Sequence, residues 1–325
     1  MNRRQFNTLA LAGVAVAVAG TARAEVESVT LHMAHDYPPG NVWYEAAQRF
    51  ADGVASRTDG KAKMQIAHSS STGSWDQNIE GLQIGTNDIV LESIGTLDRY
   101  DPLPGVEAFP YLIKDLDHFK KVYYGDVGDA FMDEVARRSG FRIIGAGYRG
   151  ARKLSANRKV ESVGDLAGLK LRVPPLKMYR RTWELLGASP VPMPVTEIFT
   201  GLQQGLIDGQ ENPLEFINTY KLGEVQSHVM NTNHVIGAMT FIFNDGRFKA
   251  LSPELQQILR EEGANAMLWA TDRVLGMEND YQKSLEDKGV VFVDVDLPAF
   301  REKVAPIADD FPDLKEWVVK FQQAG

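Results

Sequence analysis

The sequence predicts an α/β protein of two lobes, each a mixed, mostly parallel sheet flanked by helices. Three observations support this prediction. Short apolar strands alternate with amphipathic helices over short connections, as in parallel sheets that helices cover on both faces. About 300 residues follow an N-terminal export segment, which is enough for two hydrophobic cores. One helical stretch that begins near residue 252 is too long for a single small lobe.

Residues 1–24 are typical of an export signal peptide. Arg3 and Arg4 precede an apolar stretch over residues 9–18, and the small residues of a cleavage site follow at 22–24. The paired arginines favour the twin-arginine route. An uncleaved N-terminal anchor is the alternative, although the apolar stretch is short for a membrane span. We therefore expect a periplasmic protein whose mature chain does not insert into the membrane.

Composition restricts the possible partners and chemistry. The chain has 35 Lys and Arg against 43 Asp and Glu, and residues 1–24 contain three of the arginines and no acid, so the mature chain has a net charge of −11. This charge gives no electrostatic basis for binding nucleic acid or anionic lipid. The absence of cysteine excludes disulfides, thiolate catalysis and Cys-ligated metals. An anionic ligand would require a local basic pocket.

Hydrophobic periodicity predicts the elements in order. Val42, Ala46, Phe50 and Val54, for example, recur on one helical face, whereas the first strand alternates. We expect strands over 29–34, 63–67, 88–91, 141–145, 169–173 and 290–295, and helices over 42–57, 77–84, 118–139, 178–186, 197–204 and 297–311.

A long helix is predicted between residues 252 and 288. Ser252 is a typical N-cap, Pro253 suits the first helical position, and Gly289 ends the pattern. Roughly 35 helical residues span about 50 Å, which is long enough to brace two lobes. The alternative is two shorter helices that are broken near Gly276.

The motifs that would indicate an enzyme are weak. Residues 145–150 (GAGYRG) match a dinucleotide fingerprint after a strand, but the helix that the fingerprint requires does not follow. The six histidines include no zinc-protease pair, and no nucleophile elbow occurs. We therefore predict no catalytic residues, no metal site and no cofactor, and a binding protein instead of a catalyst.

Arg172 is the leading candidate for ligand binding. It lies in a short, mostly apolar strand that ends at Pro174 and Pro175, so its guanidinium has few routes to water. Burying such a group is unfavourable unless an anion meets it, and its planar fork can hold a carboxylate through two hydrogen bonds. The alternative is a structural ion pair with an internal Asp or Glu.

Other candidates lie on loops beside predicted strands and helices. His35 and Asp36 follow the first strand, where α/β sheets place ligand contacts. Trp75 offers a flat apolar face and Asp76 a hydroxyl acceptor at the start of a helix. The remaining candidates are Tyr37, Glu92 and Phe216. For each of these residues, a capping, core or surface role is the alternative.

Three stretches resemble a known family. Residues 147–155 (GYRGARKLS), 165–174 (DLAGLKLRVP) and 187–213 (GASPVPM to LQQGLIDGQENP) together resemble the substrate-binding subunits of TRAP (tripartite ATP-independent periplasmic) transporters, DctP type. The opening HDYPPG of residues 35–40 and the long helix agree with it. The resemblance covers nearly all of the mature chain.

The resemblance implies roles for four residues. In this family the arginine of the K-[LI]-R-V-P strand holds the ligand carboxylate, and it corresponds to Arg172. Arg152 lies at the spacing of an assisting arginine, with Arg149 as a nearby competitor. The Asn before Pro corresponds to Asn212, which would donate its amide to the ligand. The alternatives are a solvated charge for Arg152 and a turn-forming role for Asn212.

The resemblance also implies an architecture and partners. It implies the periplasmic binding protein fold, in which two lobes close on one ligand. Lobe I would comprise 25–150 and about 236–275, and lobe II with the brace helix 151–235 and about 276–325. The partners would be a small organic acid and the TRAP membrane permease subunits, with an ion gradient instead of ATP driving release.

The candidate residues favour a polyhydroxy acid as ligand. A carboxylate clamp, hydroxyl acceptors and aromatic faces suit a sugar acid such as a hexuronate or aldonate. A short dicarboxylate, keto acid, sulfonate or amino-acid derivative is an alternative. Two other functions also stay open: a solute sensor of the same fold, and an exported enzyme that uses the arginine pair as an anion clamp.

Overall fold

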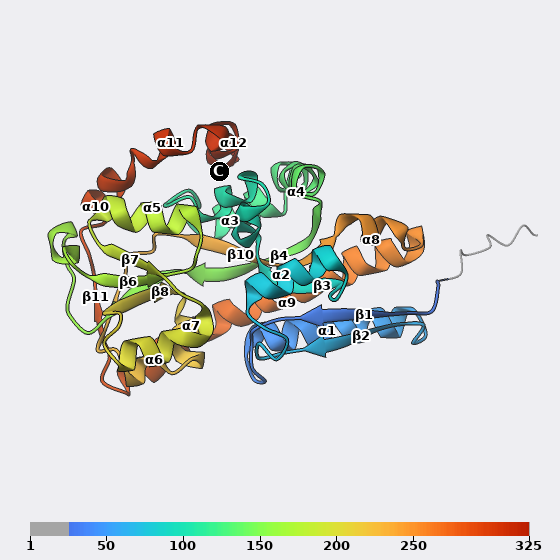
Figure 1. Cartoon of the computed structure of the whole chain (residues 1–325), viewed down its shortest axis with the longest axis horizontal. Helices are drawn as coiled ribbons and strands as arrows, with labels where there is room; N and C mark the ends of the chain where they lie inside the picture. The colour runs from blue at the N-terminus through green and yellow to red at the C-terminus, as the bar shows by residue number, and fades with distance from the viewer. Residues whose placement is uncertain (1–25, 325) are drawn as a thin grey trace, which may run out of the picture.

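Two mixed sheets form the framework of the protein (Figure 1). The computed structural model describes residues 26–324, so the predicted export signal lies outside the described residues. The five strands described in the first sheet follow the order β2-β1-β3-β10-β4, and the six in the second follow β11-β9-β5-β8-β6-β7. The first sheet contains β1 (Val29–Ala34), β2 (Ala62–Ala67), β3 (Ile89–Ser93), β4 (Phe141–Ala151) and β10 (Ile236–Asn244). The second contains β5 (Lys153–Ala156), β6 (Lys170–Val173), β7 (Ser189–Pro192), β8 (Gly209–Asn212), β9 (His228–Met230) and β11 (Val291–Val293).

Parallel pairing on one side of each sheet aligns the strand ends that matter for the site. β1 pairs in parallel with β2 and β3, and β6 pairs in parallel with β7 and β8. β10 runs antiparallel to β3 and β4, and β5 runs antiparallel to β8 and β9. Each sheet is therefore mixed, as predicted, and the carboxyl ends of its parallel strands lie at one edge.

Helices cover both sheets. Around the first sheet lie α1 (Val42–Arg57), α2 (Trp75–Ile84), α3 (Leu116–Tyr123), α4 (Asp126–Ser139) and α8 (Asp245–Ala250), and around the second lie α5 (Lys177–Leu186), α6 (Ile198–Gln203) and α7 (Leu214–Thr219). The Asn41 side chain caps α1 by accepting a hydrogen bond from the Trp43 backbone N–H at 2.8 Å. The predicted face of α1 is buried in the core.

The two sheets are connected by strands and by one long helix. β4 ends at Ala151 in the first sheet and β5 begins at Lys153 in the second, and the chain returns between β9 and β10. The helix α9 (Pro253–Glu286) is unbroken over 34 residues and packs against β4, α1 and α7. This confirms the predicted brace helix. Gly276 does not interrupt it, so the alternative of two helices is wrong.

Two predicted helices are divided in the structure. The region 118–139 forms α3 and α4, because α3 ends before Tyr124 and Gly125 is the N-cap of the next helix. Asp115 caps the N-terminus of α3. The region 297–311 forms α10 (Leu297–Val304) and α11 (Ile307–Asp310), separated at Pro306, whose ring nitrogen cannot donate to a helix. The predicted strand 141–145 extends to residue 151, which places the glycine-rich GAGYRG in a strand and not in a phosphate-binding turn.

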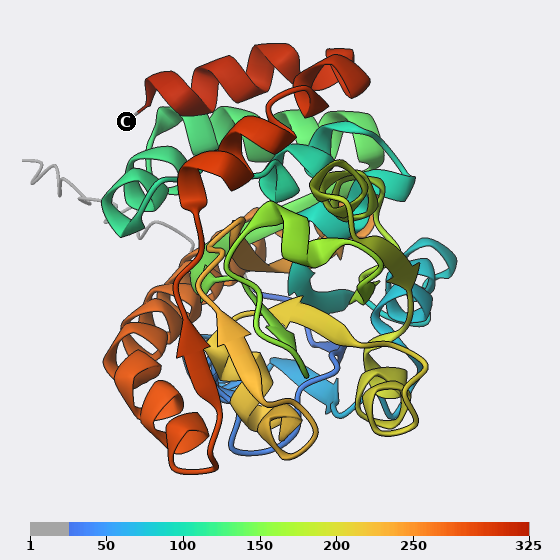
Figure 2. The ribbon, with the colours of Figure 1, turned by 90° about the vertical axis from the view of Figure 1, so that its left-hand side faces the viewer.

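The C-terminal segment contacts helices of both sheets. α10 and α11 pack against α5, whereas α12 (Lys315–Gln323) lies along α3 and α4 (Figure 2). His118 Nε2 lies 2.8 Å from the Phe321 carbonyl, and the Phe321 and Phe131 rings are 5.1 Å apart. The boundaries of lobes I and II stay a prediction. The predicted ranges assign α12 to lobe II, although α12 contacts α4, which they assign to lobe I.

Candidate ligand-binding site

A narrow cavity lies where the carboxyl ends of strands from both sheets meet. It leaves about 40 Å³ of free space, so its side chains nearly fill it. The first sheet contributes Asp36 and Tyr37 after β1, and Glu92 and Ser93 at the end of β3. The second sheet contributes Arg172 from β6 and Asn212 from β8. Nine of the eleven candidate residues line this cavity: Asp36, Tyr37, Trp75, Glu92, Arg149, Arg152, Arg172, Asn212 and Phe216.

A larger cavity elsewhere is a weaker candidate. It has a volume of about 610 Å³ and lies between α4, β4 and α9. The arginines that line it already have internal partners: Arg142 pairs with Asp245 at 2.7 Å and with Asp133, and Arg260 lies over the Phe248 ring. Arg142 is therefore neutralised within the protein and Arg260 is exposed, so neither presents a buried, unpaired cation to a ligand.

Arg172 is buried without a carboxylate partner. It is 1% exposed, its Nε donates to the Met193 carbonyl at 2.8 Å, and its Nη2 has no hydrogen-bond partner among the described residues. Burial lowers the pKa of Arg172 to about 9. The charge of Glu211 opposes this decrease, and the charge of Arg152 adds to it. The alternative was a structural ion pair, but no Asp or Glu among the described residues forms one with Arg172. An anion in the cavity would satisfy this guanidinium.

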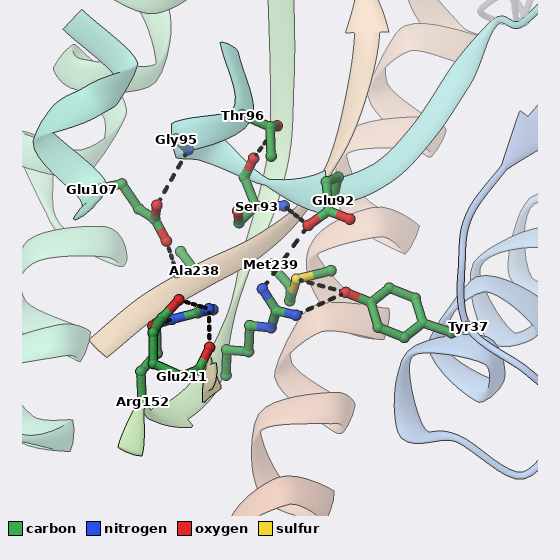
Figure 3. A network of polar contacts seen from close by, with 11 residues as sticks. Tyr37, Glu92, Ser93, Gly95, Thr96, Glu107, Arg152, Glu211, Ala238 and Met239 are labelled. Atoms are coloured by element: carbon green, nitrogen blue, oxygen red, sulfur yellow. Dashed lines mark hydrogen bonds and ion pairs between the residues drawn. The ribbon is translucent and has the colours of Figure 1, made fainter. Parts of the chain in front are cut away.

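Arg152, by contrast, is bound internally. Its Nε and Nη2 donate to the two carboxylate oxygens of Glu211 at 2.5 and 2.8 Å, and Nη2 also reaches the Glu211 carbonyl at 2.7 Å (Figure 3). His234 Nε2 lies 2.9 Å from the same carboxylate. Burial alone would raise the pKa of Glu211, but the charge of Arg152 lowers it to about 2. Arg152 is only 4% exposed, so the alternative of a solvated charge is wrong.

Arg149 occupies an intermediate position. Its Nη2 donates to the Tyr37 hydroxyl at 3.2 Å and its Nη1 lies 3.9 Å from the Glu92 carboxylate. Its Nε has no partner among the described residues. Burial raises the pKa of Glu92, and the charge of Arg149 opposes that rise. Figure 3 shows Tyr37 and Glu92 on one side of this polar network and the Arg152–Glu211 pair on the other.

Asp36 is the acidic counterpart of Arg172. It is 6% exposed, and neither carboxylate oxygen meets full hydrogen-bond geometry with a partner among the described residues, although Ser70 and the Trp75 backbone N–H lie near enough to favour its ionised form. Burial, together with the charge of Glu92, raises the pKa of Asp36 to about 7. A ligand hydroxyl is the group that would satisfy such an acceptor.

The remaining lining residues shape the cavity. The amide Nδ2 of Asn212 donates to Gln210 at 2.7 Å, which fixes its orientation. Phe216 stacks on Tyr220 with ring centroids 4.2 Å apart, and Trp75 adds a second aromatic wall. Tyr220 also donates to the Asp36 carbonyl at 3.1 Å, which connects α7 with the loop after β1.

Two candidates lie outside the cavity lining. His35 is buried beside it, where its Nδ1 accepts a hydrogen bond from the Tyr37 backbone at 3.2 Å. Burial lowers the pKa of His35 to about 4, so the ring is neutral at pH 7. Asp76 accepts a hydrogen bond from Ser74 at the start of α2. His35 and Asp76 therefore have packing and capping contacts, the alternatives weighed for them.

Sequence reasoning missed several lining residues. They are Thr96, Pro174, Leu176, Tyr179, Val195 and Tyr220. Tyr220 lies four residues after Phe216, the spacing of one helical face, and this signal could have found it. Within the described residues, no helix is long and apolar enough to cross a membrane, and no cluster of potential metal ligands occurs.

Comparisons with known proteins agree with this geometry. Residues 33–313 match the family described as bacterial extracellular solute-binding protein, family 7 (DctP). A solute-binding protein of Roseobacter denitrificans is 33% identical over 286 residues, which cover 88% of each chain.

Two solved structures extend the likeness to the whole fold. A TRAP periplasmic solute-binding protein of Xanthobacter autotrophicus with bound β-D-galacturonate has a TM-score of 0.87 and 28% identity, and the match covers 91% of this chain and 100% of that one. One of Roseobacter denitrificans with bound L-galactonate has a TM-score of 0.84 and 31% identity over 90% and 99% of the chains. The two-lobed fold and the resemblance are confirmed, and the family is one of transport receptors instead of enzymes. This chain belongs to the family 7 extracellular solute-binding proteins, the substrate-binding proteins of TRAP transporters.

Proposed function

We propose that this protein captures a sugar acid, a hexuronate or aldonate, in the periplasm and delivers it to the membrane subunits of a TRAP transporter. The observation that carries the proposal is Arg172, a buried guanidinium that faces the cavity and has no carboxylate partner within residues 26–324. Two solved relatives of this fold hold β-D-galacturonate and L-galactonate, which are both polyhydroxy monocarboxylates.

The lining residues have complementary roles in this proposal. Arg172 holds the ligand carboxylate, and the fixed amide of Asn212 assists it. Arg152 supports the site from behind, since Glu211 already occupies its Nε and Nη2. Asp36 and Glu92 accept hydrogen bonds from hydroxyl groups, while Trp75 and Phe216 cover the apolar face of the sugar chain.

Capture proceeds by hinge closure in this proposal. Lobe I is residues 25–150 with about 236–275, and lobe II is 151–235 with about 276–325. The crossings between β4 and β5 and between β9 and β10 form the hinge. A ligand that contacts Arg172 on one side and Asp36 on the other binds the closed state better than the open one, and so shifts the population toward closure.

A thermal-shift screen of the mature protein against sugar acids tests this function. A ligand at 100 times its Kd stabilises the protein by about 2.7 kcal/mol, which raises the melting temperature visibly. We expect hits among hexuronates or aldonates that disappear in Arg172→Ala. The matched control is Arg99→Ala, because Arg99 pairs with Glu80 on the surface away from the cavity. A hit that persists in Arg172→Ala, or a silent panel of acids, would contradict the proposal.

A further inference from the structure

We propose that the site selects sugar acids with a single carboxylate and rejects the corresponding diacids, and that Asp36 is the residue that makes this distinction. The inference rests on the proposed function and deepens it, because it names which sugar acids are accepted.

The carboxylates that line the cavity come from one of its walls, although that wall also contributes Arg149 from β4. The second sheet provides the guanidinium of Arg172 and the amide of Asn212, from the parallel strands β6 and β8. The first sheet provides the carboxylates of Asp36 and Glu92, at the ends of the parallel strands β1 and β3. A ligand whose carboxylate meets Arg172 therefore directs its opposite end toward Asp36 and Glu92.

The pairing of charges limits the cavity to one anionic group. Three arginines line it, but Arg152 is bound by Glu211 at 2.5 Å and Arg149 has Glu92 at 3.9 Å and the Tyr37 hydroxyl at 3.2 Å. Among the lining arginines, Arg172 alone lacks a carboxylate partner within the described residues. Arg149 keeps an Nε without a partner among the described residues, but Glu92 already lies 3.9 Å from its Nη1, so a second ligand carboxylate beside Arg149 would also meet the Glu92 carboxylate.

That second carboxylate would instead meet like charge. The Asp36 oxygens are buried and meet no full hydrogen-bond geometry among the described residues, although Ser70 and the Trp75 backbone N–H lie near them. When ionised, they accept hydrogen bonds and donate none. A terminal hydroxyl or ring hydroxyl donates to them, and the interaction satisfies both groups. A terminal carboxylate has no proton to donate and repels them in a site that excludes water.

Matched sugar acids test the inference by titration calorimetry at pH 8, above the pKa of about 7 that burial gives Asp36. D-Glucuronate, D-gluconate and D-glucarate share one configuration, and D-galacturonate, D-galactonate and galactarate share another. We expect the best monoacid of a set to bind at least about 100-fold more tightly than its diacid. Asp36→Asn should reduce that ratio about 10-fold or more, because it removes the charge and supplies an amide donor.

Asp117→Asn is the matched control. Asp117 is exposed on α3 and does not line the cavity, so the ratio should not change. Equal binding of monoacid and diacid by the wild type would overturn this inference and leave the proposed function intact. A wild type that discriminates while Asp36→Asn keeps the full ratio would also overturn it. If none of the six acids and no other sugar acid binds, the proposed function itself fails.

Discussion

Arg172 and Arg152 are two buried guanidinium groups of one cavity with opposite surroundings. They are 1% and 4% exposed, yet Arg152 has a bidentate carboxylate and Arg172 has one backbone carbonyl and no carboxylate. Burial alone therefore does not distinguish a ligand-binding arginine from a structural one. The internal ion pair does, because Glu211 forms one with Arg152 and, among the described residues, none with Arg172.

Removal of the internal anion should have the largest effect on stability. Glu211→Gln leaves the Arg152 charge buried without its counter-ion, so we expect the free energy of unfolding of the ligand-free protein to fall by about 3–5 kcal/mol. Urea denaturation followed by circular dichroism measures this change.

The same pair predicts a pH dependence. The pKa of Glu211 is about 2 in the folded protein against an ordinary 4.5, so its contribution is complete above about pH 4.5 and is lost as the pH falls toward 2. In Glu211→Gln, the loss of stability between about pH 4.5 and 2 that comes from this carboxylate should be absent. The control is Glu80→Gln, which breaks an exposed pair with Arg99 and should change stability by less than about 1 kcal/mol. Equal effects of the two substitutions would show that Arg152 does not depend on Glu211.

Replacement of Arg172 should increase the stability of the ligand-free protein, whereas replacement of Glu211 should decrease it. Arg172→Met keeps a similar length and removes a buried charge that has no counter-ion, so we expect the ligand-free protein to gain about 1–2 kcal/mol of stability. Ligand-induced stabilisation should disappear in the same variant. Urea denaturation with and without a bound sugar acid measures both. A loss of stability in the ligand-free variant would mean that Arg172 has a structural role after all.

This contrast also shows how far the sequence leads. The alternation of strands and helices and the brace helix α9 follow from periodicity and caps, and the lining residues that were predicted follow from their places beside strands and, for Arg149, Arg152 and Asn212, from the family resemblance. The Arg152–Glu211 pair does not, because it depends on how β5 registers against β8, which joins residues about 60 positions apart. The orientation of the His35 ring depends on a similar detail. A residue at the end of a strand can turn toward the cleft or into the core, and its ring lies against the Tyr37 backbone.

A single hydrogen bond across the cleft should have a smaller effect, on ligand affinity. Tyr220 belongs to the proposed lobe II and donates a hydrogen bond at 3.1 Å to the Asp36 carbonyl in the proposed lobe I. Tyr220→Phe keeps the stack on Phe216 and removes only this donor. The closed state should lose about 0.5–1.5 kcal/mol, so ligand Kd should rise about 2- to 10-fold while the open state is unaffected.

Titration calorimetry of Tyr220→Phe with the ligand found in the screen measures this effect, and Tyr124→Phe is the matched control. The Tyr124 hydroxyl lies 3.2 Å from Thr271, and both residues belong to the proposed lobe I, so its loss should leave Kd unchanged. Equal Kd values for wild type and Tyr220→Phe would show that this contact does not favour closure. The contact between Arg172 and the ligand carboxylate would then hold the cleft closed without this hydrogen bond. The unpaired arginine would account for a larger share of the binding free energy.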